Sequence, residues 1–332
     1  MTKRIYQRDN WHHFTWKEEE IQVILDKIRC LQQRLWAVMN SLSFSLKQEA
    51  ALGAFTLDIV KSSEIEGEKL NCEQVRSSIA RRLGIDFAGM TYSDDNIKQI
   101  VEITIDATQK YNKPLDKERL LEWHTAFLTR EEGKDMDNDK LDAFLHWFNS
   151  DTTTDPAIKV AIAHFWFIVI SPFKDTNGRL ARVISDLLLA RLDGNHQRFY
   201  SLSSQIFLER EHYNKILQRV KRSKKDITKC LSWFLNCIYN ALLATENTMY
   251  DTFHKTIFWD RNKDITFNVR QRLMIGKILD GFNKNFKLSD WMKIAKCGKD
   301  AAIRDIRDLM EKEILIQPKL AGKNTFYELR SF

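Results

Sequence analysis

Apolar residues recur at helical spacing along most of the chain. Near the N-terminus they stand three or four positions apart, which predicts an amphipathic helix: Ile21, Ile24, Leu25, Ile28, Leu31 and Leu35. Residues 161–170 form a dense apolar run without the alternation of a strand, which predicts a buried helix. A further apolar helix is predicted at residues 180–192. The pattern therefore predicts a mainly α-helical protein.

The C-terminal third has a different pattern. It predicts three helices and then two short strands around a basic loop: residues 267–279, 287–295, 299–312, 314–317 and 325–329. This order of elements resembles a winged-helix module that carries a small β-hairpin. We expect three regions in the chain: a helical region at 1–90, a core at 91–255 and the winged-helix-like module at 264–332.

The composition agrees with a mainly helical protein of several modules and excludes some other classes of protein. The chain has 332 residues, enough for two or three modules, and its 4 prolines and 11 glycines leave little room for a loop-rich β protein. Its five cysteines are scattered and lack metal-ligand spacing, which favours reduced thiols in a cytoplasmic protein. No apolar run reaches the roughly 18 to 20 residues that span a bilayer, and the N-terminus lacks the apolar core of a signal peptide. We expect no membrane partner.

Residues 171–182 are the part of the chain that indicates a chemistry. They read Ser-Pro-Phe-Lys-Asp-Thr-Asn-Gly-Arg-Leu-Ala-Arg, and Pro172 is expected to end the preceding apolar helix. Side chains suited to capping the next helix follow: Asp175, Thr176 and Asn177. Arg179 and Arg182 would lie in the first turn of that helix. Free backbone amides, the positive end of a helix dipole and two guanidinium groups would then meet at a site suited to phosphate.

The spacing of the charged residues makes this site more specific. Arg179 and Arg182 are three positions apart and share a helix face, so they can hold different phosphates of one polyphosphate. Asp175, just before the turn, is suited to hold Mg²⁺ against the same phosphates. The residues alone are equally consistent with an ordinary capped helix that carries surface arginines.

The same stretch resembles the signature of the Fic (filamentation-induced-by-cAMP) family, which commonly reads His-Pro-Phe-x-Asp-Gly-Asn-Gly-Arg-x-x-Arg. The shared residues are Pro172, Phe173, Asp175, Asn177, Gly178, Arg179 and Arg182. His164 and Phe167 fit the family's usual lead-in, and the resemblance runs from about residue 5 to the end of the chain. It includes an aromatic N-terminal segment, residues 11–16, which resembles the start of one branch of Fic proteins. It implies a Fic helical core and a protein adenylyltransferase, which transfers AMP from Mg·ATP to a hydroxyl of a target protein or of itself.

The resemblance also assigns roles to residues. It implies a nucleotide site formed by Asp175, Thr176, Asn177, Gly178, Arg179, Arg182 and Tyr213. Position 171, Asn177 and Arg179 would be catalytic, with Asn177 on the α-phosphate and Arg179 on the phosphate chain. Asp175 would hold the metal. Tyr213, on a later helix, is a weaker candidate for contact with the nucleotide base.

A second motif lies far from the signature. Residues 62–67, Ser-Ser-Glu-Ile-Glu-Gly, resemble the inhibitory motif that many Fic proteins carry on a separate helix. Ser62 and Glu66 are four positions apart and share a helix face, and Gly67 is a natural helix stop. Taken alone, the motif is also typical of a solvated helix end. The resemblance implies that Glu66 pairs with Arg182 and so occupies the group that would orient the γ-phosphate.

Three departures from the family bear on activity. Ser171 stands where the family has its catalytic histidine, and a serine hydroxyl cannot accept a proton at neutral pH as an imidazole can. The β-hairpin flap usual between His124 and Trp147 is predicted to be shortened or absent, because residues 130–137 lead almost directly into a helix at 141–148. Thr176 replaces a glycine and would need the backbone angles of that turn.

Two other functions therefore stay open. Without a general base the protein could be a nucleotide-binding pseudoenzyme that signals through its partners. The winged-helix-like module could bind DNA or another protein. Its third helix has cations suited to DNA, Lys299, Arg304, Arg307 and Lys312, but equally acids that would repel it, Asp300, Asp305, Asp308 and Glu311. The formal net charge of +7 favours DNA only weakly in a chain of this length.

Overall fold

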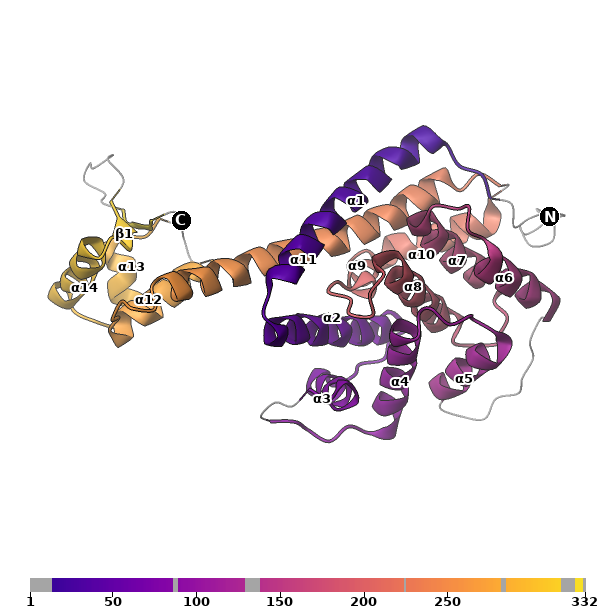
Figure 1. Cartoon of the computed structure of the whole chain (residues 1–332), viewed down its shortest axis with the longest axis horizontal. Coiled ribbons are helices and arrows are strands. Elements are labelled where there is room, and N and C mark those ends of the chain that lie inside the picture. Colours follow the sequence, from indigo (N-terminus) through magenta and orange to yellow (C-terminus); the bar gives the residue numbers. More distant parts are fainter. Residues whose placement is uncertain are drawn as a thin grey trace. The chain divides into compact units, whose positions relative to one another are not determined.

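A computed structural model of the chain describes residues 14–85, 89–128, 138–223, 225–281, 285–317 and 326–330. The chain divides into two compact units, Met1–Thr245 and Glu246–Phe332. Helices form most of both units (Figure 1), which confirms the mainly α-helical fold. The finer division into regions at 1–90, 91–255 and 264–332 stays a prediction.

The first unit contains ten helices among its described residues, and an eleventh begins in it. Their bounds are α1 Glu18–Ser41, α2 Phe44–Ile65, α3 Cys72–Leu83, α4 Asp95–Gln109, α5 Lys117–Phe127, α6 Asn138–Ser150, α7 Pro156–Ile170, α8 Asn177–Asp193, α9 Leu202–Leu208, α10 Arg210–Arg222 and α11 Thr228–Arg261. The helices predicted at residues 161–170 and 180–192 are thus α7 and α8. Each is longer than its apolar run.

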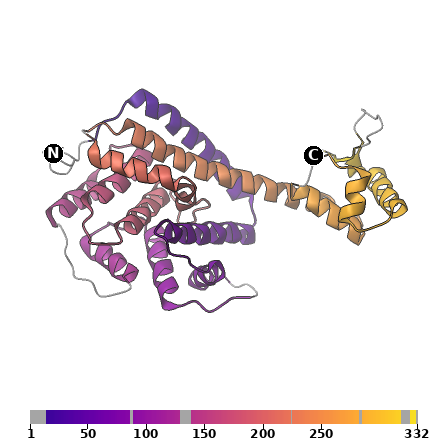
Figure 2. The ribbon, with the colours of Figure 1, turned by 180° about the vertical axis from the view of Figure 1, so that it is seen from behind.

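Helices α7 and α8 form the centre of this unit and pack extensively against each other. The view from behind shows α10, which packs against α7, on the near side of the unit (Figure 2). Nearly every side chain of α7 is buried, because its sequence is apolar on all sides. The helix ends at Ser171, whose backbone is left-handed, and Pro172 follows. The chain then turns sharply and enters α8, so the signature stretch lies between two buried helices.

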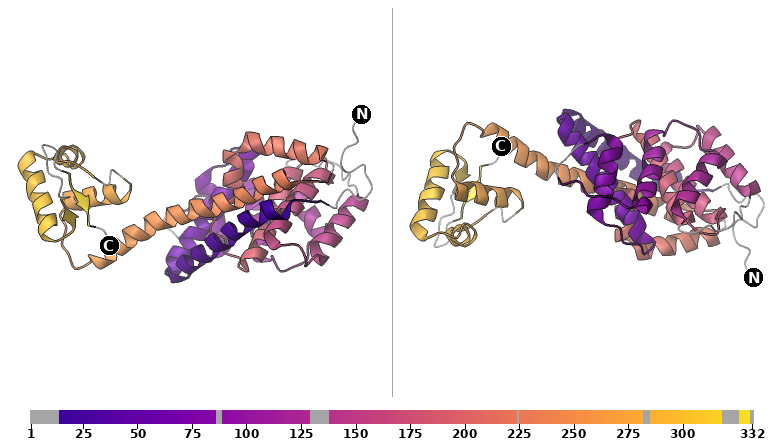
Figure 3. Two further views of the ribbon diagram at one scale, coloured as in Figure 1. Left: turned by 90° about the horizontal axis from the view of Figure 1, so that it is seen from above. Right: turned by 90° about the horizontal axis from the view of Figure 1, so that it is seen from below.

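Helices α2, α3 and α4 form a second group, seen together from below (Figure 3). Helix α2 packs against α9 through the buried Asp58, whose carboxylate accepts hydrogen bonds from the Ser201 hydroxyl, the Ser203 amide and the Ser203 hydroxyl. Helix α4 packs against α8. These contacts hold the C-terminal end of α2 close to the start of α8.

Helix α1 is tied to the start of α11. The Thr15 amide donates to the Lys225 carbonyl at 3.0 Å, and the Ile227 amide donates to the Thr15 carbonyl at 2.9 Å. The buried face of α1 follows the predicted spacing, with Ile21, Leu25, Ile28, Leu31 and Leu35 inside. Residues 11–13 of the aromatic N-terminal segment lie outside the described residues.

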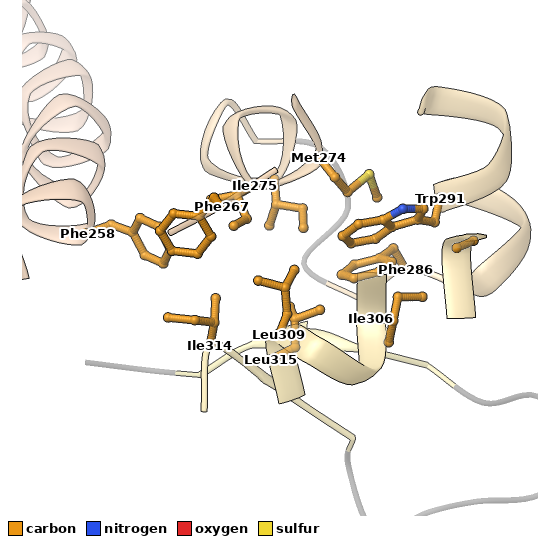
Figure 4. Packing of buried hydrophobic residues seen from close by; sticks show 12 residues of the cluster. Phe258, Phe267, Met274, Ile275, Phe286, Trp291, Ile306, Leu309, Ile314 and Leu315 are labelled. Atoms are coloured by element: carbon orange, nitrogen blue, oxygen red, sulfur yellow. The ribbon is translucent and has the colours of Figure 1, made fainter. Parts of the chain in front are cut away.

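The second unit has its own core. It contains the later part of α11 and then α12 Val269–Leu279, α13 Leu288–Ile294, α14 Lys299–Glu311, β1 Leu315–Ile316 and β2 Glu328–Leu329. The strands pair antiparallel, with Leu315 opposite Leu329. Within the buried cluster, the ring of Trp291 lies against that of Phe286 (Figure 4), with 5.8 Å between the ring centroids. These elements follow the order predicted for a winged-helix-like module.

Two expectations from composition concern residues that the structure describes. None of the five cysteines is in a disulfide. Among the described residues, no helix combines the length and the apolar character that crossing a bilayer requires.

Candidate functional site

The signature residues form a tight turn between α7 and α8. Ser171 and Thr176 both have left-handed backbone angles, with φ of 42° and 66°. The side chain of Asn177 fixes the turn from inside: its Oδ1 accepts the amide of Phe173 at 3.1 Å, and its Nδ2 donates to the Phe173 carbonyl at 2.6 Å. The predicted contact of Asn177 with an α-phosphate stays a prediction, since in this structure its amide holds the turn.

The expected side-chain cap of α8 is absent. Thr176 is the N-cap residue, but its hydroxyl is hydrogen-bonded to Nδ1 of His124, at 2.8 Å, instead of the helix amides. Asp175 accepts the Thr176 amide at 2.6 Å. The capping prediction was therefore wrong, because these side chains take other partners. The amides of the first turn of α8 lack a cap from Thr176, which suits a helix start that binds an anion.

Thr176 adopts the backbone conformation that the family's glycine would supply. A left-handed backbone at a β-branched residue costs on the order of 1–3 kcal/mol. The hydrogen bond to His124 offsets part of this cost. His124 is buried and stacks on Phe173, with 4.1 Å between the ring centroids. Burial lowers the pKa of His124, and Asp175 only partly opposes this shift, so the imidazole is neutral at pH 7.

Arg182 is held by Ser62 and Glu66 of the second motif, residues 62–67. It is 2% exposed, and its Nε donates to the Ser62 hydroxyl at 2.8 Å. Its Nη2 donates to the Ser62 carbonyl at 3.0 Å and to Oε1 of Glu66 at 2.8 Å. The structure therefore contains the ion pair expected between Glu66 and Arg182. The inhibitory role of Ser62, Glu66 and Gly67 remains a prediction.

Glu66 also lies directly against the first turn of α8. A Cβ atom added at Gly178 would be only 2.5 Å from Oε1 of Glu66, so the carboxylate occupies space that any other residue type would need. A negative charge at this end of a helix is favourable, because the exposed amides carry partial positive charge. Glu66 thus stands where an anionic ligand of α8 would be expected.

A contact that sequence reasoning missed engages the other arginine. Nη2 of Arg179 donates to Oε2 of Glu68 at 2.7 Å. Oε1 of Glu68 accepts Nδ2 of Asn96, from α4, at 2.9 Å. The guanidinium also lies 5.7 Å from the centre of the Phe127 ring. The sequence does show a second acidic residue, Glu68, two positions after Glu66, which could have indicated this contact.

The chain reverses between these two acids at Gly67. Its φ of 86° is the left-handed conformation that glycine adopts readily, and the predicted helix stop is confirmed. The Glu68 amide donates to the Ser63 carbonyl at 3.0 Å, which closes the end of α2. Glu66 and Glu68 therefore leave one tight turn and contact two arginines of α8.

Tyr213 lies in the interior instead of on an open nucleotide pocket. It is 2% exposed, and its hydroxyl is 2.9 Å from Nε2 of His164. Nδ1 of His164 is 3.0 Å from the Ser185 hydroxyl and 3.2 Å from the Ala181 carbonyl. Burial raises the pKa of Tyr213 to about 12 and lowers that of His164 to about 3. The charge of Arg182 acts on both groups, so this neutral pair lies beside the arginine.

Two of the predicted site residues, at the position of the family's catalytic histidine and at the metal position, are exposed on the same turn. Ser171 is exposed, and its hydroxyl donates to the Ile168 carbonyl at 2.7 Å. Asp175 is also exposed. The described residues form no group of three or more histidine, cysteine, aspartate or glutamate side chains that could hold a metal. The prediction that the flap between His124 and Trp147 is shortened or absent depends on residues 130–137, which lie outside the described residues.

Comparison with known proteins identifies the domain that contains this turn. The family model described as Fic/DOC family matches residues 95–189, which include the whole signature and both arginines. Residues 95–189 therefore form a Fic/DOC-type domain. A second family model, a domain of unknown function (DUF4172), matches residues 5–85 and so includes Glu66 and Glu68.

Solved structures share this Fic fold. A Fic family protein from Desulfovibrio desulfuricans G20 is 18% identical with a TM-score of 0.56, over 96% of this chain and 98% of its own. A Fic domain containing signaling protein from Bacteroides thetaiotaomicron VPI-5482 is 18% identical with a TM-score of 0.50, over 68% of this chain and 98% of its own. At these identities the likeness concerns the fold.

One curated relative has a named activity. Protein adenylyltransferase fic-1 of Caenorhabditis elegans is 36% identical over 55 residues, which are 16% of this chain and 11% of that protein. The matched part is thus about a tenth of the relative's length. The named activity is that of the relative.

Proposed function

We propose that the protein is a protein adenylyltransferase whose nucleotide site is the start of α8. It transfers AMP from Mg·ATP to a hydroxyl side chain of a target protein or of itself. One observation supports this proposal above all: carboxylates of a single segment, residues 66–68, contact both arginines of α8 and its first turn. A site that attracts two carboxylates has the charge and geometry to hold phosphates.

The reaction exchanges one bond at the α-phosphorus. The target hydroxyl oxygen forms a bond to phosphorus, the bond to the bridging oxygen of the β-phosphate breaks, and pyrophosphate leaves. The first-turn amides and Arg179 would stabilise the charge on the phosphates, and Asn177 would keep the turn in shape. The hydroxyl proton needs an acceptor, and Ser171 does not supply one. We therefore expect the transfer to be weak in this chain.

Asp175 is a suitable residue for Mg²⁺. Magnesium is usually bound through one or two carboxylates together with substrate phosphates and water. An exposed carboxylate beside an anion site meets that need without further protein ligands. Mg²⁺ would neutralise part of the charge of the phosphates when it is bound.

Replacing Arg179 with alanine tests the assignment of the nucleotide. We expect Mg·ATP to bind about 10- to 100-fold more weakly, because a charge-assisted hydrogen bond contributes about 1.5–3 kcal/mol. Titration calorimetry measures this change. Arg179→Lys keeps the charge but loses the planar guanidinium group. Its affinity for Mg·ATP should therefore lie between those of the unchanged protein and Arg179→Ala. Equal affinity in all three proteins would show that the nucleotide does not bind here.

A specific observation favours DNA binding as a second function, in the second unit. Two of the acids that would repel DNA from α14 are engaged by other side chains. Asp305 is 4% exposed and pairs with Arg270 at 2.6 Å, and Asp308 accepts Gln271 at 2.7 Å. Arg304 and Arg307 stay exposed, and no acidic side chain in the described part of the chain pairs with them.

The charge of the unit agrees with this preference. Residues 246–332 hold 17 lysine and arginine residues against 12 aspartate and glutamate residues, so most of the chain's net charge lies there. The exposed cations of α14 would contact phosphates, as a helix in the major groove does. A protein partner is the competing possibility for this face.

Anisotropy of a fluorescent DNA duplex, titrated at several salt concentrations, tests this second function. We expect Arg304→Ala and Arg307→Ala each to weaken binding and to reduce the slope against log salt by about one. Lys277→Ala removes the same charge from α12 and should change little. Absence of binding at low salt, or an equal decrease in affinity in all three variants, would favour a protein partner for α14.

A further inference from the structure

We propose that Glu68 is a second competitor for the phosphate site and sets which nucleotides the protein admits. The inference rests on the proposed nucleotide function of α8. Glu66 acts on Arg182, and Glu68 acts on Arg179 in the same way. Because the two arginines would hold different phosphates, each acid competes with a different phosphate of the nucleotide.

The side chain of Glu68 is held in a fixed position by its contacts. Each carboxylate oxygen has its own donor, Arg179 at 2.7 Å and Asn96 at 2.9 Å. Both carboxylate and guanidinium are mostly buried, with side-chain exposures of 29% and 17%. Three elements therefore converge on this ion pair: the turn after α2, α4 and α8. An ordinary surface pair would leave both side chains in water.

Binding of a phosphate at Arg179 exchanges one anion for another. A partly buried guanidinium needs a negative partner, because an isolated charge is costly away from water. Glu68 supplies that partner in this structure. A β-phosphate that takes its place must first separate Glu68 from Arg179. The nucleotide therefore binds more weakly than it would to a free Arg179, and the difference equals the free energy of the ion pair between Glu68 and Arg179.

The two acids differ in the nucleotides they oppose. Arg179 is assigned to the phosphate chain that ADP and ATP share, whereas Arg182 is assigned to the γ-phosphate that only ATP has. Glu68 therefore opposes both nucleotides through Arg179, whereas the contact of Glu66 with Arg182 opposes ATP alone. It also follows that removing Glu66 leaves Arg179 occupied.

The tight turn at Gly67 joins the two contacts. Glu68 is fixed to the end of α2 through its amide and to α4 through Asn96. Asn96 is thus a positioning residue for Glu68 and does not touch Arg179 in the described contacts. Its replacement should reproduce part of the effect of removing the Glu68 charge.

Calorimetry with Mg·ADP and Mg·ATP on single variants tests the inference. Glu68→Gln keeps the shape of the side chain and removes its charge, so we expect both nucleotides to bind about 10-fold more tightly. Glu66→Gln should tighten ATP more than ADP, because only ATP has the phosphate assigned to Arg182. Asn96→Ala should tighten both by less than Glu68→Gln does.

Glu64→Gln is the matched control. It removes the same charge from the same turn, but Glu64 pairs with Lys61 at 2.6 Å and with no arginine of α8 in the described residues. It should leave both affinities unchanged. The inference is wrong if Glu68→Gln matches this control while Glu66→Gln tightens ATP, a result that keeps the proposed function. If no variant binds either nucleotide, both the function and the inference are wrong.

Discussion

Replacing Ser171 with histidine is expected to raise the rate of AMP transfer by about 10²- to 10⁴-fold. This is the range that a positioned general base contributes. Ser171 is exposed at the start of the turn that leads to α8, so an imidazole there would lie beside the proposed phosphate site. Histidine must adopt the left-handed backbone of this position, where φ is 42°. Transfer of label from α-³²P-ATP to protein measures the rate.

The comparison also separates an enzyme from a pseudoenzyme. Transfer that is measurable with Ser171 and faster with histidine supports a weakened enzyme, while transfer with histidine alone supports a nucleotide-binding pseudoenzyme. Glu66→Gly is best tested in both backgrounds, because inhibition and the absence of the base could each limit the rate. If Glu66→Gly changes neither ATP binding nor transfer in either background, residues 62–67 are only a helix end.

Acid should destabilise the first unit through His164. Its pKa is about 3 in the folded protein, because it is fully buried beside the charge of Arg182, and about 6.5 in an unfolded chain. Below pH 6.5 the unfolded state therefore binds more protons than the folded state. The free energy of unfolding should fall by about 1.4 kcal/mol per pH unit between pH 6.5 and 3, or about 5 kcal/mol in all.

Urea denaturation at pH 7 and at steps down to pH 4 measures this decrease. His164→Gln is the control, since an amide can still bond Tyr213 and Ala181 but does not titrate. The variant starts from a lower stability at pH 7 and should lose less of it on acidification. Parallel decreases in both proteins would assign the acid sensitivity to the carboxylates instead.

The helices could be predicted from the sequence because their burial is local and periodic. The run at residues 161–170 is apolar on all sides, and it forms the buried helix α7. The predicted N-caps failed for a reason that the local sequence does not contain. The partner of Thr176 is His124, which is 52 positions away and becomes a neighbour only when α5 packs near the turn.

Contacts in the site could be predicted only between residues that belong to recognised motifs. The contact of Glu66 with Arg182 follows from two motifs read together, whereas Glu68 and Arg179 are 111 positions apart and no motif joins them. The ion pair of Asp305 in α14 could not be predicted for the same reason. Asp305 looks like a surface acid in the helix pattern, yet it is buried against Arg270, which lies 35 positions away on α12.

The lack of space at Gly178 has a consequence for how this protein can change by mutation. Glycine and alanine codons differ by one nucleotide, and the added methyl group of alanine could not coexist with the carboxylate of Glu66 in its present place. A substitution at Gly178, inside the signature, would then displace the side chain of Glu66, which is distant in the sequence but adjacent in the structure. Gly178 and Glu66 are therefore expected to be epistatic, so that the effect of a change at one position depends on which residue stands at the other.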